Sequence, residues 1–220
     1  MKMKHKIIYR FLEIITRPYT LGLINGIKGL DNVPKKGGFI IVANHESYLD
    51  PPIIKAMIDK YFKRIVYYLT KKEAYDKFFK KLFFDIVGTI SVDRQKGDIT
   101  ALNEAIKTLK EGGIIGIFPE GTRSRDGKLH KGKTGAVRIA LAAKYPIIPI
   151  GIQGTYELWP PHQKLPKRKK KVIISIGKPI SLEKYYNQRV TKELLREVTD
   201  KIIMPEIAKL SNQIYDPKDE

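Results

Sequence analysis

Short apolar runs alternate along the chain with stretches in which hydrophobic residues recur at helical spacing. The runs have the length of strands, and Gly or Pro bounds several of them, which favours strand over helix. We expect strands at residues 38–43, 64–69, 88–92, 114–118, 147–152 and 172–176. Helical spacing predicts helices at 99–111, behind a possible Asp98 cap, and at 134–145. The alternation predicts an α/β fold with a mixed, largely parallel sheet flanked by helices.

The composition is that of a globular chain with a strong excess of positive charge. With 220 residues, the length fits a single domain, and 42 Lys and Arg against 23 Asp and Glu give a net charge of +19. Such a charge attracts an anionic partner, namely nucleic acid, phospholipid headgroups or an acidic protein. The sequence has no cysteine, which excludes disulfides and thiolate metal sites and fits a reducing compartment. Because no apolar run approaches the roughly 20 residues that cross a bilayer, we expect no membrane-spanning segment.

Polar sequences follow three of the predicted strands, after residues 43, 92 and 118. In α/β sheets, ligands bind beyond the carboxyl ends of strands, so these loops are the places to look for chemistry. The first loop, "NHESYLD", contains His45 and Asp50. Asp50 before two prolines is also typical of a helix N-cap, which leaves a purely structural interpretation open.

Metal binding and covalent catalysis fit the first loop poorly. "HES" resembles the start of a zinc-binding H-E-x-x-H sequence, but residue 49 is Leu and the other histidines lie scattered. Ser47 lacks the G-x-S-x-G turn of a serine hydrolase. A histidine beside a carboxylate suits a general base that takes a proton from a bound hydroxyl. Asp50 can accept helix-start amides and still face His45, because the helix begins at Asp50.

The second and third loops, "GTISVDR" and "FPEGTRS", offer cations at strand ends. Arg94, Arg123 and nearby Arg125 are candidates for a phosphate site, because a guanidinium matches two phosphate oxygens. Gly121 permits close approach of the backbone. The alternative is that Arg94 pairs with Asp93, and Arg123 with Glu120, on the surface.

Taken together, "NHESYLD", "GTISVDR", "FPEGTRS" and "IIPI" at 147–150 resemble the four motifs of the glycerolipid acyltransferases, in order and spacing. The resemblance covers residues 38–150, and its fourth motif has Ile148 where Val is usual. It implies that His45 is the catalytic base and Asp50 its orienting partner. It also implies that a phosphate site is formed by Arg94, Glu120, Gly121, Thr122 and Arg123.

The resemblance further implies transfer of a fatty acyl group from a thioester to the sn-2 hydroxyl of 1-acylglycerol 3-phosphate (lysophosphatidic acid), giving phosphatidic acid without an acyl-enzyme. The thioester is carried by acyl carrier protein or coenzyme A, and neither a cofactor nor a metal is expected.

Two other classes compete with this interpretation. Residues 127–134, "GKLHKGKT", match the P-loop pattern, although charged residues separate them from the preceding predicted strand. The run "PKRKKK" at 166–171 suits a nucleic-acid backbone, but no nucleic-acid-binding signature accompanies it, so we expect no nucleic acid partner.

An anionic membrane surface is the partner we expect for the basic charge. Hydrophobic residues recur at helical spacing between Ile7 and Tyr19, with lysines and arginines nearby, as in an interfacial amphipathic helix. Packing of this helix on the domain is the alternative. We therefore divide the chain into a membrane-associating segment at 1–30 and an acyltransferase domain at 31–220. We also expect peripheral attachment to the cytoplasmic face of the cell membrane, with Trp159 as a further interfacial anchor.

Overall fold

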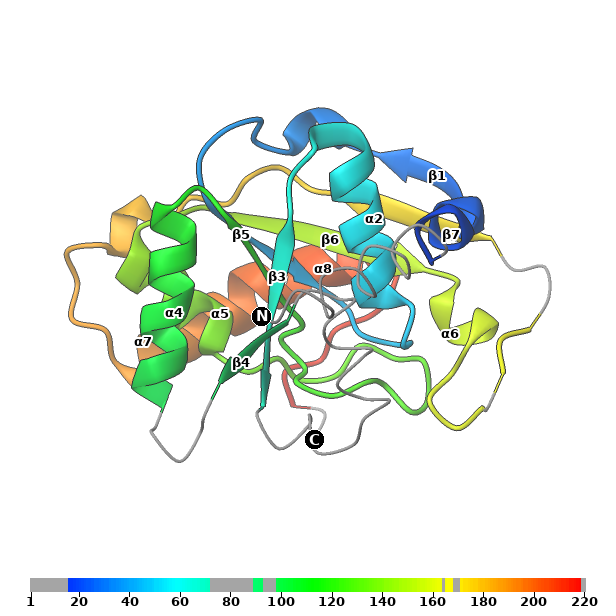
Figure 1. Ribbon diagram of the computed structural model, residues 1–220. Helices are drawn as coiled ribbons and strands as arrows, with labels where there is room; N and C mark the ends of the chain where they lie inside the picture. Colours follow the sequence, from blue (N-terminus) through cyan, green and yellow to red (C-terminus); the bar gives the residue numbers. More distant parts are fainter. Residues whose placement is uncertain (1–15, 72–88, 93–97, 164, 168–170, 219–220) are drawn as a thin grey trace.

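The computed structural model describes residues 16–71, 89–92, 98–163, 165–167 and 171–218 (Figure 1). Its strands join in one sheet, in the order β1-β7-β6-β2-β5-β3-β4. The strands are β1 (Ile24–Lys28), β2 (Phe39–Ala43), β3 (Val66–Lys71), β4 (Thr89–Val92), β5 (Ile114–Ile117), β6 (Ile147–Gln153) and β7 (Val172–Ile176). β6 and β7 are antiparallel, and the other neighbouring pairs are parallel. The predicted mixed, largely parallel sheet is confirmed.

Helices cover both faces of the sheet (Figure 1). They are α2 (Asp50–Phe62), α4 (Asp98–Lys110), α5 (Gly135–Ala143), the single turn α6 (Thr155–Leu158), α7 (Lys192–Val198) and α8 (Met204–Ser211). A π-helical turn, η5 (Thr199–Ile203), connects α7 to α8, and short 3-10 turns are η1 (Leu30–Asn32) and η4 (Glu183–Tyr185).

Central strand β2 is buried at every position because both of its faces are covered. Phe39, Ile41 and Ala43 pack in one apolar cluster with α2. Ile40 and Val42 face the opposite cluster, to which α4, α5, α7 and α8 contribute. A continuous apolar run is the pattern expected of such a strand, since successive side chains point to opposite faces.

All six predicted strands are confirmed. The strand at 172–176 has the predicted ends, and the others are shifted by one or two residues at one end or both. The helices predicted after Asp98 and Thr134 are confirmed as well. β1 was not predicted, because its sequence INGIK contains the poor strand formers Asn and Gly and is held by its pairing with β7. Helices α7 and α8 were not predicted either.

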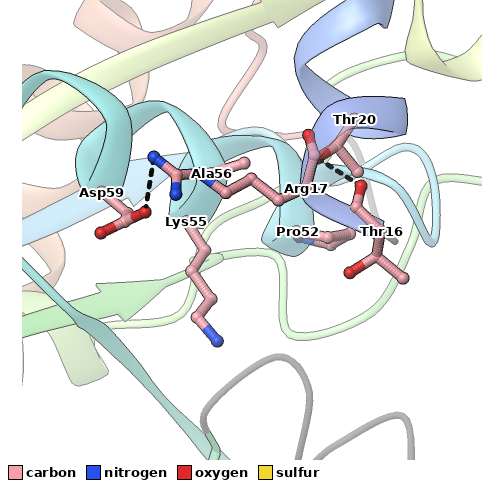
Figure 2. Close-up of a pocket in the computed structure, with 7 residues that line it drawn as sticks. All are labelled: Thr16, Arg17, Thr20, Pro52, Lys55, Ala56 and Asp59. Carbon is pink, nitrogen blue, oxygen red and sulfur yellow. Dashed lines mark hydrogen bonds and ion pairs between the residues drawn. The ribbon is translucent and has the colours of Figure 1, made fainter. Parts of the chain in front are cut away.

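The described end of the N-terminal segment packs on α2. Residues 16–23 are helical, and Arg17 forms an ion pair with Asp59 of α2 at 3.0 Å, as Figure 2 shows. β1 lies in the sheet of the domain, which therefore starts before residue 31. Membrane association of residues 1–30 stays a prediction, and residues 1–15 lie outside the described part of the chain. Within the described ranges, no helix combines the length and apolar character needed to cross a bilayer.

Candidate active site

The site lies at the carboxyl ends of β2 and β5, which are neighbouring parallel strands. Val42 of β2 pairs with Ile117 of β5, so the loops that follow these two strands start side by side. The first loop carries residues 44–49 and leads into α2, and the second carries residues 118–134 and leads into α5. The sheet thus brings together the first and third predicted motifs, as expected for ligand sites in α/β sheets.

His45 and Asp50 form a hydrogen-bonded pair. Nδ1 of His45 lies 2.8 Å from Oδ2 of Asp50, and the Asp50 side chain is fully buried, whereas that of His45 is 17% exposed. The same Oδ2 accepts the amides of Glu46 and Ser47, each at 2.7 Å. Since Nδ1 faces Asp50, the other ring nitrogen, Nε2, remains for a substrate.

The expected helix-cap role of Asp50 is wrong. Asp50 is the first residue of α2, whose N-cap is Leu49, and no side-chain hydrogen bond caps this helix. The Asp50 carboxylate instead turns back onto amides of the preceding loop. It therefore fixes the shape of the loop that carries His45.

Loop 118–134 holds the main chain and the ring of His45. The His45 amide donates to Oε1 of Glu120 at 2.8 Å, and the His45 carbonyl accepts the amide of Ser124 at 2.7 Å. The Phe118 ring stacks on the imidazole with centroids 4.1 Å apart. With both main-chain groups and one ring face held, the imidazole has little freedom to turn.

Glu120 is buried, and its carboxylate accepts hydrogen bonds from main-chain amides of the site. Its second oxygen accepts the amide of His130 at 3.2 Å, so the carboxylate joins the catalytic loop to the far part of its own loop. Burial raises the pKa of Glu120 to about 8 against the opposing effect of the two amides. The alternative in which Glu120 pairs with Arg123 is wrong, because both oxygens bind main-chain amides.

Arg123 lies over the ring of Tyr48, with its Cζ 3.5 Å from the ring centroid. Its Nη1 is buried and has no hydrogen-bond partner in the described structure. An unpaired buried guanidinium nitrogen is costly, so its presence beside a catalytic loop indicates a place for an anion.

Of the other residues predicted for the phosphate site, Gly121 and Thr122 lie on one turn of the described structure, and Arg94 lies outside the described residues. Gly121 has a φ of 73°, and a Cβ there would meet Nζ of Lys133 at 2.8 Å, which places this lysine over the turn. Thr122 is exposed on the same turn. Asp93 also lies outside the described residues, so the predicted role of Arg94 stays a prediction.

A buried polar network, which the sequence did not predict, lies behind the loop at residues 44–49. Nδ2 of Asn44 donates to Oε1 of Glu46 at 2.9 Å, and the Asn44 amide group also forms two 2.8 Å bonds to the main chain of Ile152. Gln213, from the C-terminal end, donates to Glu46 and to the carbonyl of Gly127. Burial, followed by the charge of Asp50, raises the pKa of Glu46 to about 7.

Gln213 reaches this network because α8 packs tightly on β6. A Cβ at Gly151 of β6 would lie 2.1 Å from the carbonyl carbon of Leu210, so only glycine permits this approach. Asn44 and Glu46 lie within the first motif, NHESYLD, so their position in the sequence was a signal that could have marked them as candidates. Gln213 lies 167 residues from Glu46, and no local pattern marks it.

The P-loop and serine-nucleophile interpretations do not match the geometry. Residues 127–134 do not follow a strand directly, since residues 118–126 separate them from β5, and the amide of His130 is bound to Glu120. The positions 168–170 within the basic run at 166–171 lie outside the described residues. Ser47 is buried and donates to the carbonyl of Trp159 at 2.7 Å, which is a structural role.

Among the described residues, no cluster of three or more His, Asp or Glu side chains is placed to hold a metal ion. A carboxylate-held histidine with an accessible ring nitrogen, next to an unpaired arginine, defines an enzyme that activates a bound hydroxyl for group transfer.

Comparison with known proteins specifies the group that is transferred. The family model described as Acyltransferase matches residues 26–153. The 1-acyl-sn-glycerol-3-phosphate acyltransferase of Bacillus subtilis (strain 168) is 32% identical over 197 residues, which cover 88% of this chain and 92% of that protein. The probable 1-acyl-sn-glycerol-3-phosphate acyltransferase of Mycoplasma pneumoniae is 25% identical over 217 residues, or 97% of this chain and 79% of that protein.

A solved structure supports the same assignment. The crystal structure of the 1-acyl-sn-glycerophosphate (LPA) acyltransferase from Thermotoga maritima matches with a TM-score of 0.66 and 26% sequence identity, covering 96% of this chain and 83% of that one. The chain belongs to the acyltransferase family and is an enzyme of that class. The resemblance indicated by the four sequence motifs is confirmed.

The pair of His45 and Asp50 gives a first prediction. Asp50→Asn keeps an oxygen for the loop amides but removes the charge that orients and stabilises the imidazolium, so kcat should fall by about 10³-fold or more. The melting temperature should change little. The control is Asp59→Asn, which alters an aspartate of the same helix that pairs with Arg17. An Asp50→Asn enzyme with near-normal turnover would show that this carboxylate only supports the loop.

The raised pKa of Glu46 gives a second prediction. The unfolded chain ionises this group near 4.5 and the folded protein near 7, so the folded state holds the extra proton and the unfolding free energy falls as pH rises between these values. Glu120 acts with the same sign. Glu46→Gln keeps the acceptor oxygen and should reduce this fall by on the order of 3 kcal/mol.

Urea unfolding at pH 5 and pH 8 measures this effect, with exposed Glu183→Gln as the matched control. If Glu46→Gln and the wild type lose equal stability over this range, Glu46 is ionised in the folded protein and the assignment is wrong.

Proposed function

We propose that the enzyme transfers a fatty acyl group from an acyl thioester to the sn-2 hydroxyl of 1-acylglycerol 3-phosphate, forming phosphatidic acid in phospholipid synthesis. The observation that carries the proposal is the His45–Asp50 pair, at 2.8 Å, beside an arginine with an unpaired buried nitrogen. The names of the relatives support this acceptor.

The proposed reaction requires one proton relay. Nε2 of His45 takes the proton of the acceptor hydroxyl while its oxygen attacks the thioester carbonyl, and the Asp50 carboxylate stabilises the resulting imidazolium. The tetrahedral intermediate then expels the thiolate, which receives the proton from His45. The ester and the free thiol leave, and the histidine returns to its starting state. No acyl-enzyme is required, because a thioester is already activated.

The acceptor's phosphate has a matching cationic surface. Nη1 of Arg123 lacks a partner, and Lys133 approaches the Gly121 turn without an ion pair to any described carboxylate. We place the phosphate at these two side chains, with Thr122 at the exposed rim. Arg94 is retained in the proposal on the strength of the resemblance alone.

The donor is a thioester of acyl carrier protein or of coenzyme A. Both carriers are anionic, and a net charge of +19 attracts either one, so charge does not choose between them. The chemistry at His45 is the same with both carriers.

The proposal is tested with purified protein, 1-acylglycerol 3-phosphate and each donor in turn, by following release of the free thiol. Phosphatidic acid should form with at least one donor, and His45→Ala should abolish it. Arg123→Lys loses the two-pronged contact and should raise the KM for the acceptor about tenfold, with less effect on the KM for the donor.

Arg189→Lys, which changes an exposed arginine between η4 and α7, is the control for Arg123→Lys. Thiol release that continues in His45→Ala would refute the assignment of the base. Equal changes of both KM values in Arg123→Lys would indicate that this arginine supports the fold.

We also propose peripheral attachment to the cytoplasmic face of the cell membrane, where the lipid acceptor resides, through the segment that precedes β1 and through basic side chains. The protein should co-sediment with anionic vesicles, and salt should weaken binding, since charge attraction is screened over about 8 Å at physiological ionic strength. Protein that stays in the supernatant at low salt would exclude this attachment.

A further inference from the structure

Tyr48 occupies an unassigned position between the two catalytic residues. It lies in the loop from His45 to Asp50, and its ring carries the guanidinium of Arg123 at 3.5 Å. The residue is 40% exposed, so its ring is only partly covered. The contact joins the loop of the base to the loop of the proposed phosphate site.

An aromatic face is a suitable support for an arginine that must bind an anion. A carboxylate would hold Arg123 through the in-plane N–H groups and would then compete with the phosphate for them. The ring of Tyr48 instead attracts the flat face of the guanidinium, which leaves those N–H donors available. The unpaired Nη1 is consistent with this arrangement.

Tyr48 is itself supported from a third loop. The ring of Trp159 lies 5.8 Å from that of Tyr48 at an angle of 52°. Trp159 is fixed at both ends, because its Nε1 donates to the carbonyl of Gln163 at 2.9 Å and its carbonyl accepts the hydroxyl of Ser47. Trp159, which the sequence suggested as a membrane anchor, thus buttresses the ring beneath Arg123.

We propose that Tyr48 is a positioning residue for acceptor recognition, whose ring sets Arg123 at a fixed place relative to His45. The inference rests on the proposed function. It makes the loop from His45 to Asp50 responsible both for the base and for the preference for a phosphate-bearing acceptor. A phosphate seated on Arg123 then helps to bring the acceptor hydroxyl to Nε2 of His45.

Binding can be measured without turnover, because Trp159 is the only tryptophan of the chain and lies beside Tyr48. Glycerol 3-phosphate is titrated while the fluorescence of Trp159 is followed. Tyr48→Leu should weaken binding about fivefold through loss of the aromatic face, and Tyr48→Phe, which keeps that face, should bind like the wild type.

Tyr61→Leu is the matched control. Tyr61 is 46% exposed and has Lys60 over its ring at 5.1 Å, but it lies near the opposite end of α2 from the catalytic loop. Its loss should leave the binding of glycerol 3-phosphate unchanged.

Turnover gives the second measurement, with 1-acylglycerol 3-phosphate compared with the monoacylglycerol of the same chain. Tyr48→Leu should lower kcat/KM about fivefold for the phosphorylated acceptor and clearly less for the acceptor that lacks the phosphate. A general defect of folding would lower both values together.

Unchanged binding by Tyr48→Leu, or an equal loss in Tyr48→Phe, would overturn the inference, as would equal losses on both acceptors. If the wild type acylates neither acceptor while Tyr48→Leu still weakens glycerol 3-phosphate binding, the proposed function is wrong and the role of Tyr48 stands.

Discussion

The buried carboxylate of Asp50 organises the active site through a single oxygen. Oδ2 accepts two loop amides and faces Nδ1 of His45, so one atom sets both the path of the chain and the orientation of the base. Three N–H groups on Oδ2 offset part of the cost of placing a carboxylate in the protein interior, whereas Oδ1 is buried without a hydrogen-bond partner in the described structure. The position depends on α2 starting at Asp50, since the helix presents the carboxylate to the loop that precedes it.

Three acidic side chains are buried close together at the site. Asp50, Glu46 and Glu120 are all buried, and like charges so close together disfavour one another. Asp50 receives several donors, whereas the pKa values of Glu46 and Glu120 are raised to about 7 and 8. The two glutamates therefore hold their protons near neutral pH more readily than ordinary glutamates. This limits the negative charge of the site while their oxygens continue to accept hydrogen bonds.

The site is assembled from segments that the sheet brings to one edge. The β2 and β5 loops meet because their strands are parallel neighbours, and the region after α6 contributes Trp159. Gln213 arrives from the opposite end of the chain on the tightly packed α8. The surroundings of His45 thus depend on packing in parts of the molecule that carry no recognisable motif.

Local sequence determined much of this protein. Apolar runs and turn residues predicted six strands, because burial on both faces requires continuous hydrophobicity. The motifs predicted His45 and Asp50 as a pair, which follows from residue chemistry and loop position. They also offered Arg123 as a candidate for a phosphate site, but left open whether it pairs with Glu120. Only the tertiary structure decided that Asp50 binds the loop instead of capping α2, that Glu120 binds amides, and that β1 is a strand. Only the tertiary structure places the ring of Tyr48 under Arg123. It also brings Gln213 within hydrogen-bond distance of Glu46. These contacts depend on strand order and on close helix packing across the whole chain, and the spacing of residues along a sequence contains no information about either.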